Sequence, residues 1–432
     1  MASGFILAAP SSGSGKTSLT FGLLAAFRAA GMAAQGFKVG PDYIDPQFHT
    51  LASGLPCPNL DPWAMSPNRL RAVLSGARAE LCVIEGVMGL FDGVQQPGQN
   101  GRDGSTASLA KELDLPVVLV IDAKGMSGSV AALAQGFQRF DPAVTLAGVI
   151  LNRVGSARHE DMLRTALEGV GLPVLGALPR LPELVWPSRH LGLTQPRELP
   201  DMQGQAERLA AVIQKNFDLP ALRALARPMP STDKPLQQGF FPADARVAVA
   251  RDAAFSFIYP HWLPEQAQSF SPLANERVPD DAMLVFLPGG YPELHAATLS
   301  RADAFRDSLR AAHARGAMIY GECGGYMALG QAMTVNGERF EMAGLLPVVT
   351  HYSDGAARTL GYRSMTAPED FWAGSRLNGH EFHASTAENL EPPSLFQAMD
   401  SRQASLGLLG HRKGNTMGSY LHIIDRADAV PE

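Results

Sequence analysis

The sequence has only three cysteines among its 432 residues, no long apolar run and no excess of basic residues. Cys57, Cys82 and Cys323 lack the pairs and spacings of a disulfide framework or a zinc site. No apolar stretch reaches the roughly 18 residues of a membrane span, and the first residues lack the basic start of a signal peptide. The net charge of −6 offers no basic footprint for nucleic acid or an anionic membrane. These absences predict a cytoplasmic protein whose partners are small molecules.

What is present is the composition of a core-forming globular protein, with 46% hydrophobic and 18% charged residues. At roughly 150 residues per domain, the chain is too long for one ordinary core. Short apolar runs alternate with amphipathic segments, as in a parallel sheet covered by helices, and the pattern restarts after a proline-rich stretch. We therefore predict two α/β domains, 1–226 and 245–432, joined by a linker at 227–244. The expected strands are 5–9, 81–84, 117–121, 146–151, 246–250, 283–287 and 318–320.

The first domain opens with a phosphate-binding motif. An apolar run at 5–9 precedes small residues whose backbone N–H groups can converge on phosphates at the start of a helix over 17–30. Lys16 is expected to bridge phosphate oxygens and Thr17 to bind Mg²⁺. The usual first glycine of the motif is Pro10 here, so the motif alone leaves an ordinary turn as an alternative. The residues predicted to bind the nucleotide are Ser12, Gly13, Ser14, Gly15, Lys16, Thr17 and Asn152.

Two later strands strengthen this prediction. Glu85 ends a buried-looking strand, where the magnesium of a nucleotide needs a second protein ligand, and Asn152 closes another strand, where its amide could read the base. Two loops, 38–46 and 86–93, are dense in glycine, proline and acid, which turn chemistry alone could explain. We instead predict Asp45, with Glu85, as a metal ligand and catalytic group. Predicted substrate contacts are Asp42, Tyr43, Asp92, Arg189 and His190.

Four carboxylates around one phosphate would repel it unless Mg²⁺ and Lys16 offset their charge. At most two or three of Asp42, Asp45, Glu85 and Asp92 are therefore expected to touch the phosphate directly. Arg189 and His190 could pair with carboxylates of a substrate, although a surface helix end explains them equally well.

The second domain carries a nucleophile elbow at 321–326, Gly-Glu-Cys-Gly-Gly-Tyr. An apolar run ends there in Cys323 and a helix-like stretch follows, so the flanking glycines can tolerate the strained turn that exposes the sulfur. The Gly324 N–H and the start of the following helix favour a thiolate and, later, an oxyanion. The loop 287–293 follows another strand, and we predict that Gly290 and Gly324 form an oxyanion hole.

A cysteine nucleophile needs a base, and the predicted one is His422, on an expected strand end. The alternatives are His351, His380, His383 and His411. His380 and His383 could suggest a metal pair, but in an extended segment their spacing places the two rings on opposite faces. Substrate contact or plain loop structure is favoured there. Cys57 and Cys82 are expected to be buried or loop bystanders.

These motifs resemble a known family. The elbow, the loop Pro-Gly-Gly-Tyr-Pro-Glu at 288–293 and the late histidine resemble a class I glutamine amidotransferase of the cobalamin-pathway type. Segments 39–46 and 85–93 look like the dethiobiotin-synthetase-like ATP domain of the cobyrinic acid a,c-diamide synthase family. Segments 189–193 and 379–383 also look like stretches of that family. The resemblance spans essentially the whole chain. It implies a P-loop NTPase parallel-sheet domain followed by a class I glutamine amidotransferase α/β domain.

The resemblance also implies a reaction. Glutamine would be hydrolysed at Cys323, with His422 moving the proton that releases ammonia. A macrocycle carboxylate would attack the γ-phosphate of MgATP, and ammonia would convert the acyl phosphate to an amide, once each on the a and c acetate side chains. The loop at 9–13 is similar to the branch that acts on hydrogenobyrinic acid; cobyrinic acid and nickel-sirohydrochlorin are the alternative substrates. A homodimer is possible.

The chain departs from the family at three places. Many relatives carry a glutamate two residues after the histidine, where this chain has Ile424, so the third member is absent or supplied by Glu322 or Asp425. Pro10 replaces a glycine, and 259–270 looks short for the helix and strand expected there. Two other classes, a P-loop ATPase switch and a cysteine hydrolase with a regulatory nucleotide domain, stay open. ATP use driven by glutamine separates these classes.

Overall fold

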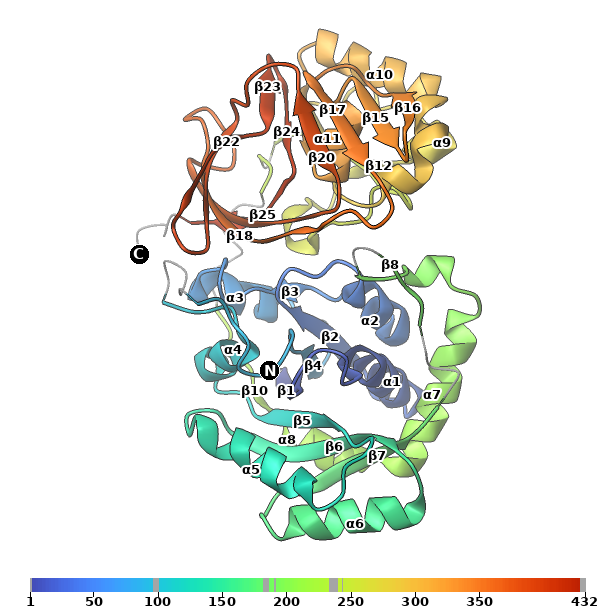
Figure 1. Cartoon of the computed structure of the whole chain (residues 1–432), viewed down its shortest axis with the longest axis vertical. Helices are drawn as coiled ribbons and strands as arrows, with labels where there is room; N and C mark the ends of the chain where they lie inside the picture. The colour runs from blue at the N-terminus through green and yellow to red at the C-terminus, as the bar shows by residue number, and fades with distance from the viewer. Residues whose placement is uncertain are drawn as a thin grey trace. The chain divides into compact units, whose positions relative to one another are not determined.

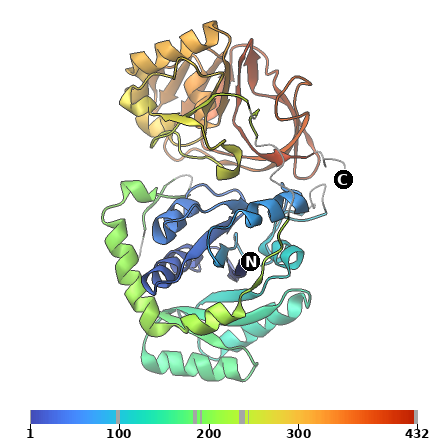
Figure 2. The same cartoon turned by 180° about the vertical axis from the view of Figure 1, so that it is seen from behind.

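The computed structural model describes residues 2–95, 101–181, 186–189, 192–232, 240–242 and 244–427. The chain divides into two compact units, 1–235 and 236–432, which Figures 1 and 2 show from opposite sides. The division falls inside the stretch predicted as a linker. The first two residues of that stretch, Arg227 and Pro228, form strand β10 beside β1 and so belong to the sheet of the first unit.

The first unit is built on one sheet in the order β3-β2-β4-β1-β5-β6-β7, in which all these strands run parallel. Its strands are β1 Ser3–Ala8, β2 Ala34–Val39, β3 Asn59–Leu60, β4 Leu81–Glu85, β5 Val117–Asp122, β6 Leu146–Val154 and β7 Val174–Pro179. A separate two-stranded sheet pairs β8 Ser188–Arg189 with β9 Gly192–Leu193. Strands β2 and β4 are buried along their whole length, as expected of parallel strands covered on both faces.

Helices cover this sheet. They are α1 Lys16–Ala29, α2 Asp45–Ser53, α3 Pro67–Ser75, α4 Thr106–Leu113, α5 Ser129–Phe140, α6 Ala157–Glu168, α7 Met202–Asn216 and α8 Leu219–Leu225. Helix α1 packs against α2 and α7, and α5 and α6 lie side by side (Figure 1). Gly22 lets α7 approach α1 closely, because a Cβ there would meet Leu209 and Ile213 at 2.6 and 2.5 Å. The first helix is thereby fixed between its neighbours.

The second unit contains a six-stranded sheet, β12-β11-β13-β14-β24-β23, which is parallel except for β23. Its strands are β11 Val247–Ala250, β12 Gln268–Phe270, β13 Leu284–Leu287, β14 Met318–Glu322, β23 His411–Lys413 and β24 Thr416–Ser419. Helices α9 Ala296–Ser300, α10 Asp303–Ala314 and α11 Gly324–Leu329 accompany it. The segment 259–270 folds as the short turn Pro260–Trp262 and the edge strand β12.

Two smaller sheets complete the second unit. A four-stranded sheet, β16-β15-β17-β20, combines β15 Ala332–Val335, β16 Glu338–Glu341, β17 Val348–Tyr352 and β20 Thr386–Asn389. A five-stranded antiparallel sheet, β22-β21-β18-β19-β25, combines β18 Thr359–Thr366, β19 Arg376–His383, β21 Phe396–Asp400, β22 Ser405–Leu409 and β25 Leu421–Arg426. The predicted base, His422, lies on β25 and therefore belongs to this five-stranded sheet.

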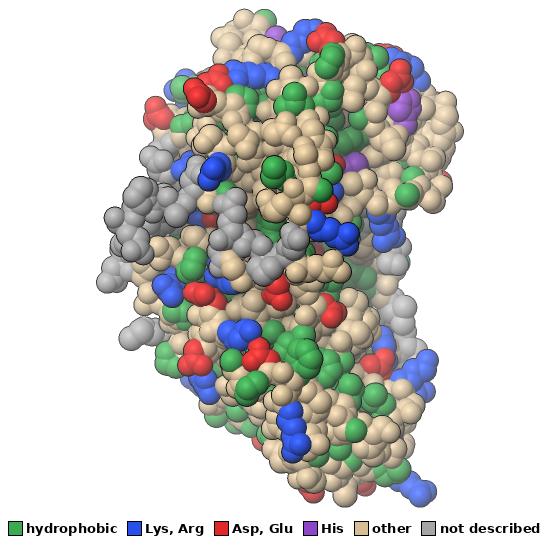
Figure 3. Space-filling view, turned by 60° about the vertical axis from the view of Figure 1, so that its left-hand side comes forward, with side chains coloured by type: hydrophobic (Ala, Val, Ile, Leu, Met, Phe, Trp, Pro, Cys, Tyr) green, Lys and Arg blue, Asp and Glu red, His purple; other side chains and the backbone are tan. Residues whose placement is uncertain are grey.

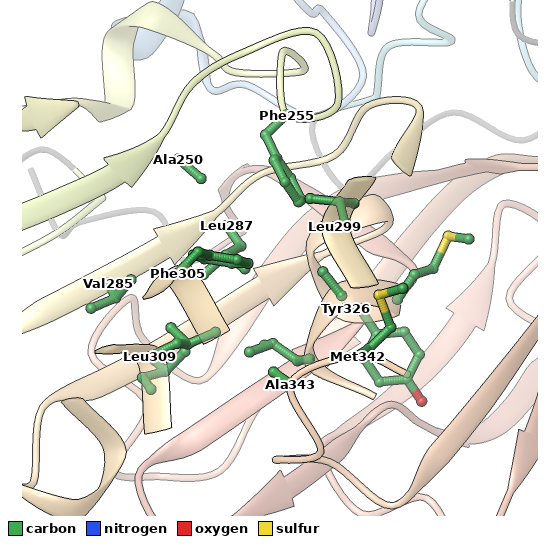
Figure 4. Close-up of a cluster of buried hydrophobic side chains, with 14 of the residues drawn as sticks. Ala250, Phe255, Val285, Leu287, Leu299, Phe305, Leu309, Tyr326, Met342 and Ala343 are labelled. Atoms are coloured by element: carbon green, nitrogen blue, oxygen red, sulfur yellow. The ribbon is translucent and has the colours of Figure 1, made fainter. Parts of the chain in front are cut away.

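A buried cluster holds the parallel sheet of the second unit to its helices. Figure 4 shows Phe305 and Leu309 of α10 beside Val285 and Leu287 of β13. Tyr326 of α11 belongs to the same cluster. The nucleophile elbow therefore joins a strand and a helix that are both anchored in this core.

On the face drawn in Figure 3, side chains of Lys and Arg are interspersed with those of Asp and Glu. This mixture agrees with the modest net charge of −6. Among the described helices, none is both long and apolar enough for a bilayer crossing.

Replacing Phe305 by alanine should destabilise the second unit by about 3–5 kcal/mol, because the ring is 1% exposed and its loss leaves a cavity. Hydrogen–deuterium exchange of amides in β13 and β14 measures the effect. Leu360→Ala, at a side chain 67% exposed in the same unit, is the control and should change stability by less than about 0.5 kcal/mol. Equal protection in both variants would contradict the described packing.

Candidate active sites

The phosphate-binding motif lies in the loop between β1 and the start of α1. Gly13 and Gly15 have φ of 80° and 90°, in the left-handed region that favours glycine. The Ser14 hydroxyl donates to the Ser11 carbonyl at 2.9 Å, so the loop is closed on itself. Lys16 and Thr17 begin α1, where backbone N–H groups and the helix dipole favour an anion. The predicted nucleotide-binding residues from Ser12 to Thr17 thus form one loop of suitable geometry.

Asn152 lies beside this loop although it comes from β6. Its amide nitrogen donates to the Ser14 carbonyl at 2.8 Å, and its amide oxygen accepts from the Arg153 N–H at 2.9 Å. A Cβ on Gly15 would clash with that amide. Asn152 therefore supports the shape of the loop, and its contact with a base stays a prediction.

Three oxygen donors converge next to the loop. The Thr17 hydroxyl lies 3.1 Å from Asp45 Oδ2 and 2.9 Å from Glu85 Oε1. Carboxylate and hydroxyl oxygens are the protein ligands that Mg²⁺ prefers. The donor set that was predicted from the sequence is brought together and suits this ion.

Lys38 lies between the same two carboxylates, at 2.6 Å from Asp45 Oδ2 and 2.8 Å from Glu85 Oε1. It stands directly opposite Glu85 across the pairing of β2 with β4. Burial alone would lower the pKa of Lys38, but the charges of Asp45 and Glu85 raise it well above its usual value. Lys38 is thus a cation held among the candidate metal ligands.

The two carboxylates have opposite pKa shifts. Burial raises the pKa of Asp45 to about 8, and the nearby charge of Asp42 acts in the same direction. Burial would also raise the pKa of Glu85, but Lys38 and His49 hold it below its usual range. The surroundings thus favour the charged form of Lys38 and of Glu85 and oppose ionisation of Asp45.

Sequence analysis missed Lys38 and His49 as members of this cluster. His49 Nε2 lies 2.5 Å from Glu85 Oε2, and both side chains are fully buried. His49 follows Asp45 by four residues on α2, so the two share a helix face, and Lys38 is a charged residue at the end of an apolar strand. The spacing of Asp45 and His49 by four residues was the signal available in the sequence, whereas the burial of Lys38 is seen only in the structure.

Lys16 points to the other predicted loop. Its ammonium group donates to the Met88 carbonyl, and burial lowers its pKa to about 8. Asp92 accepts a hydrogen bond from the Gly89 N–H at 2.9 Å. Its negative charge acts against the lowering of the pKa of Lys16. Met88 has a φ of 44°, which is a strained conformation for a residue with a side chain. The loop 86–93 thus lies beside the phosphate-binding motif.

The remaining predicted substrate contacts lie in different settings. Asp42 accepts from the N–H groups of Ile44 and Asp45 and so fixes the start of α2, and the Tyr43 side chain beside it is buried. Arg189 forms two hydrogen bonds with Glu198, at 2.9 and 2.8 Å, and lies in β8, so the helix-end alternative was wrong. His190 lies outside the described residues.

The elbow in the second unit has the expected geometry. Cys323 follows β14 directly and precedes α11, with φ 47° and ψ −106°. A positive φ is costly for a residue with a Cβ, such as Cys323. Because α11 lies close to β13, the residues next to Cys323 must also be small. A Cβ on Gly325 would clash with the Leu287 carbonyl. The glycines thus permit the strained turn that carries the sulfur.

Two backbone amides converge on this sulfur. The backbone N–H groups of Gly290 and Gly324 both lie close enough to Cys323 to lower the pKa of its thiol. Gly290 N lies 3.2 Å from the position that a Cβ on Gly324 would take. The pair predicted as an oxyanion hole is therefore placed where it can stabilise negative charge on an atom next to the sulfur.

His422 comes from β25 and reaches the same place. A Cβ on Gly289 would clash with the His422 ring and would lie 3.3 Å from the Cβ of Cys323, so both side chains flank Gly289. The rings of His422 and His380 are stacked with centroids 4.8 Å apart. Burial lowers the pKa of His422 well below its usual value, and the neighbouring His380 adds to the shift.

The other histidines named from the sequence have structural partners. His383 stacks on Tyr420 with centroids 3.9 Å apart, and its Nε2 lies 3.1 Å from Glu381. His411 Nδ1 lies 2.7 Å from the Tyr326 hydroxyl, and His351 pairs with Glu388 on the surface. Among the residues that the structure describes, no three side chains of His, Cys, Asp or Glu are grouped so that they could hold a metal ion by themselves.

The surroundings of Cys323 favour the neutral thiol over the thiolate. Burial, with a contribution from Glu293, raises its pKa well above its usual value. Its S–H donates to the Phe382 carbonyl at 3.7 Å. Cys57 and Cys82 are also buried, and burial raises their pKa values, to about 12 for Cys82.

Comparisons with known proteins bear on both units. Residues 5–193 match the family model of the CobQ/CobB/MinD/ParA nucleotide binding domain, and residues 246–430 match that of the CobB/CobQ-like glutamine amidotransferase domain. The hydrogenobyrinate a,c-diamide synthase of Rhizobium meliloti (strain 1021) is 45% identical, over 98% of this chain and 99% of its own length. The protein of the same name from Rhodobacter capsulatus is 46% identical, over 98% of each chain.

Alkylation of Cys323 by iodoacetamide in the absence of ligands should be slow at pH 7. Only the thiolate reacts, and a thiol with a raised pKa gains thiolate about tenfold per pH unit, so the rate should rise by about that factor per unit between pH 7 and 9. Mass spectrometry of the peptides measures the rate, with Cys323→Ser as the control. A rate that levels off below pH 8 would show a thiolate already present and would contradict the neutral site.

Proposed function

The chain belongs to the family of the hydrogenobyrinate a,c-diamide synthases, and from this premise we propose that it amidates the a and c acetate carboxylates of hydrogenobyrinic acid in cobalamin biosynthesis. ATP activates each carboxylate as an acyl phosphate, and glutamine supplies the nitrogen. The observation that carries the proposal is the presence of a nucleotide-binding unit and a glutamine amidotransferase unit in one chain that is 45% identical to the named relative over 98% of its length.

The glutaminase half of the reaction is assigned to the elbow. The Cys323 sulfur attacks the side-chain amide carbon of glutamine, and the Gly290 and Gly324 N–H groups stabilise the resulting oxyanion. His422 takes the thiol proton and gives it to the leaving nitrogen, which departs as ammonia. Water then hydrolyses the thioester to glutamate and the free thiol.

The synthetase half is assigned to the phosphate-binding loop. The loop and Lys16 hold the phosphates of ATP, and Thr17, Asp45 and Glu85 would hold Mg²⁺, which supplies charge neutralisation at the γ-phosphate. A substrate carboxylate attacks the γ-phosphorus and ADP leaves. Phosphorylation is required because a free carboxylate is a poor acyl donor at neutral pH.

Lys38 and His49 add to this assignment. His49 orients Glu85 through Oε2 and leaves Oε1 for Thr17 and Lys38. The Lys38 charge compensates the two carboxylates, which would otherwise repel both ATP and a polycarboxylate substrate. Asp42, Tyr43 and Asp92 are proposed to contact the substrate, whereas Arg189 would first have to leave Glu198.

A cytoplasmic location is part of the proposal, and the use of ATP and glutamine and the three unbridged cysteines support it. A homodimer and the preference for the cobalt-free macrocycle are part of the proposal. Cobyrinic acid and nickel-sirohydrochlorin are the competing acceptors, because the same chemistry would serve any acetate side chain of such a macrocycle.

The test of the function is ADP release with Mg²⁺ and glutamine, in the presence of hydrogenobyrinic acid or cobyrinic acid. We expect hydrogenobyrinic acid to stimulate ADP release and to gain two amides, as read by mass spectrometry. A preference for cobyrinic acid would overturn the substrate assignment. Glutaminase activity without stimulation by either macrocycle would overturn the proposed acceptor.

The two sites should separate by nitrogen source. Cys323→Ser should abolish amidation with glutamine and leave amidation with ammonium chloride largely intact, because ammonia bypasses the thiol. Lys16→Ala should abolish amidation with both donors, because it removes the cation at the phosphates. Equal loss of both activities in Cys323→Ser, or amidation retained in Lys16→Ala, would contradict the two-site assignment.

A further inference from the structure

A histidine that acts as a base must be held in one tautomer. A hydrogen bond from its distal Nδ1–H to a carboxylate does this in cysteine and serine nucleophile sites, and leaves the lone pair of Nε2 for the nucleophile. The residue two positions beyond His422 is Ile424, which cannot accept such a bond. The orienting group must come from another segment if this chain has one.

Glu322 meets the requirement. Its Oε2 lies 3.9 Å from His422 Nδ1, and both side chains are buried. Its other oxygen, Oε1, accepts from the Tyr320 hydroxyl at 3.0 Å and from the Ile423 N–H at 3.0 Å. The carboxyl group is thus tied to the residue next to His422 on β25 and leaves Oε2 as the oxygen that faces the ring.

We propose that Glu322, the residue immediately before the nucleophile, is the positioning residue for His422. This inference rests on the proposed glutaminase function of Cys323. A separation of 3.9 Å is about 1 Å too long for a hydrogen bond, and such contacts are often long in sites without substrate and shorten when it binds. The hydrogen bond from the Ile423 N–H holds the Glu322 carboxyl group beside β25, so that Oε2 stays next to His422 Nδ1 while the distance between them shortens.

The second carboxylate considered for this role, Asp425, has a different setting. It lies on β25 opposite Asn378, whereas His422 lies opposite His380. A β-bulge between Asn378 and Gly379 separates the two positions. Because Asn378 and His380 lie two residues apart on β19, the bulge puts Asp425 on the same face of β25 as His422, at the next position of that face. Asp425→Asn is therefore the variant that separates the two buried carboxylates, of which Glu322 lies 3.9 Å from His422 Nδ1.

Charge supports the assignment. The titratable groups that surround Glu322 are Tyr320 on its own strand, the adjacent Cys323, and His422 with the stacked His380. Burial raises the pKa of Glu322 to about 8, while the bonds from Ile423 and Tyr320 oppose the shift. A carboxyl with a raised pKa keeps its proton below about pH 8 and becomes an acceptor above it, so glutamine hydrolysis should accelerate as pH rises through this range.

The test compares Glu322→Gln, Glu322→Asp and Asp425→Asn in the full chain, with hydrolysis of glutamine and amidation by ammonium chloride measured in parallel. Glu322→Gln should lower kcat for glutamine by about 10²-fold or more, since orientation of the base is lost, while KM changes less than about threefold. Glu322→Asp should recover part of kcat. Asp425→Asn and all ammonia-dependent rates should stay near those of the unchanged chain.

A kcat for Glu322→Gln within about twofold of the unchanged chain would overturn the proposal, and so would a loss as large in Asp425→Asn. If Cys323→Ser failed to separate the two nitrogen sources, the proposed function itself would fail, independently of Glu322. If both Glu322 variants also lost ammonia-dependent amidation, as a folding defect would cause, the pH profile of Tyr320→Phe would test the proposal instead. Loss of its hydroxyl bond should raise the pKa of Glu322 and move the rise of kcat to higher pH, and an unmoved profile would overturn the proposal.

Discussion

The burial of parallel strands on both faces is the constraint on which both candidate sites depend. Side chains within such strands pack against helices, so polar groups are tolerated chiefly where the strands end. In the first unit, Lys38 lies near the end of β2 and Glu85 ends β4. In the second unit, Gly289 follows β13 and Glu322 ends β14. Segments distant in sequence thereby meet at one edge of each sheet.

Glu85 and Glu322 show how the surroundings of such a position decide its chemistry. Each is the last residue of a buried parallel strand, and burial pushes the pKa of each upward. Lys38 and His49 reverse this effect at Glu85, which is ionised and suited to a cation. Glu322 has a hydroxyl and a backbone N–H as partners instead, so its pKa stays raised. The surroundings thus lower the pKa of one buried glutamate and raise that of the other.

The sequence predicted what is local in the chain. Strands β1, β4, β5 and β6 of the first unit, the phosphate-binding loop and the elbow follow from apolar runs and glycine positions within a few residues of one another, whereas β2, β3 and β7 were not predicted. It did not predict the antiparallel sheets after residue 332, because strands such as β20 are exposed along their length and lack an apolar pattern. His49 was missed because its partner, Glu85, is 36 residues away. The partner of Arg189 was missed although Glu198 is only nine residues on, because two charges that near can pair or face solvent equally well.

The neutral state of the second site follows from the same physics. Cys323, His422 and Glu322 are all buried, and burial shifts the pKa of each toward its neutral form. Each pKa unit corresponds to about 1.4 kcal/mol, so a buried thiolate and imidazolium form only when their mutual attraction and new hydrogen bonds offset that cost. The Gly290 and Gly324 N–H groups supply part of the offset on the sulfur side. The proposed positioning residue, Glu322, would supply the matching part at His422 Nδ1, since a carboxylate stabilises the imidazolium that forms when the thiol gives up its proton. Under this proposal, the thiolate and the imidazolium would form only when bound substrate brings Cys323, His422 and Glu322 closer together.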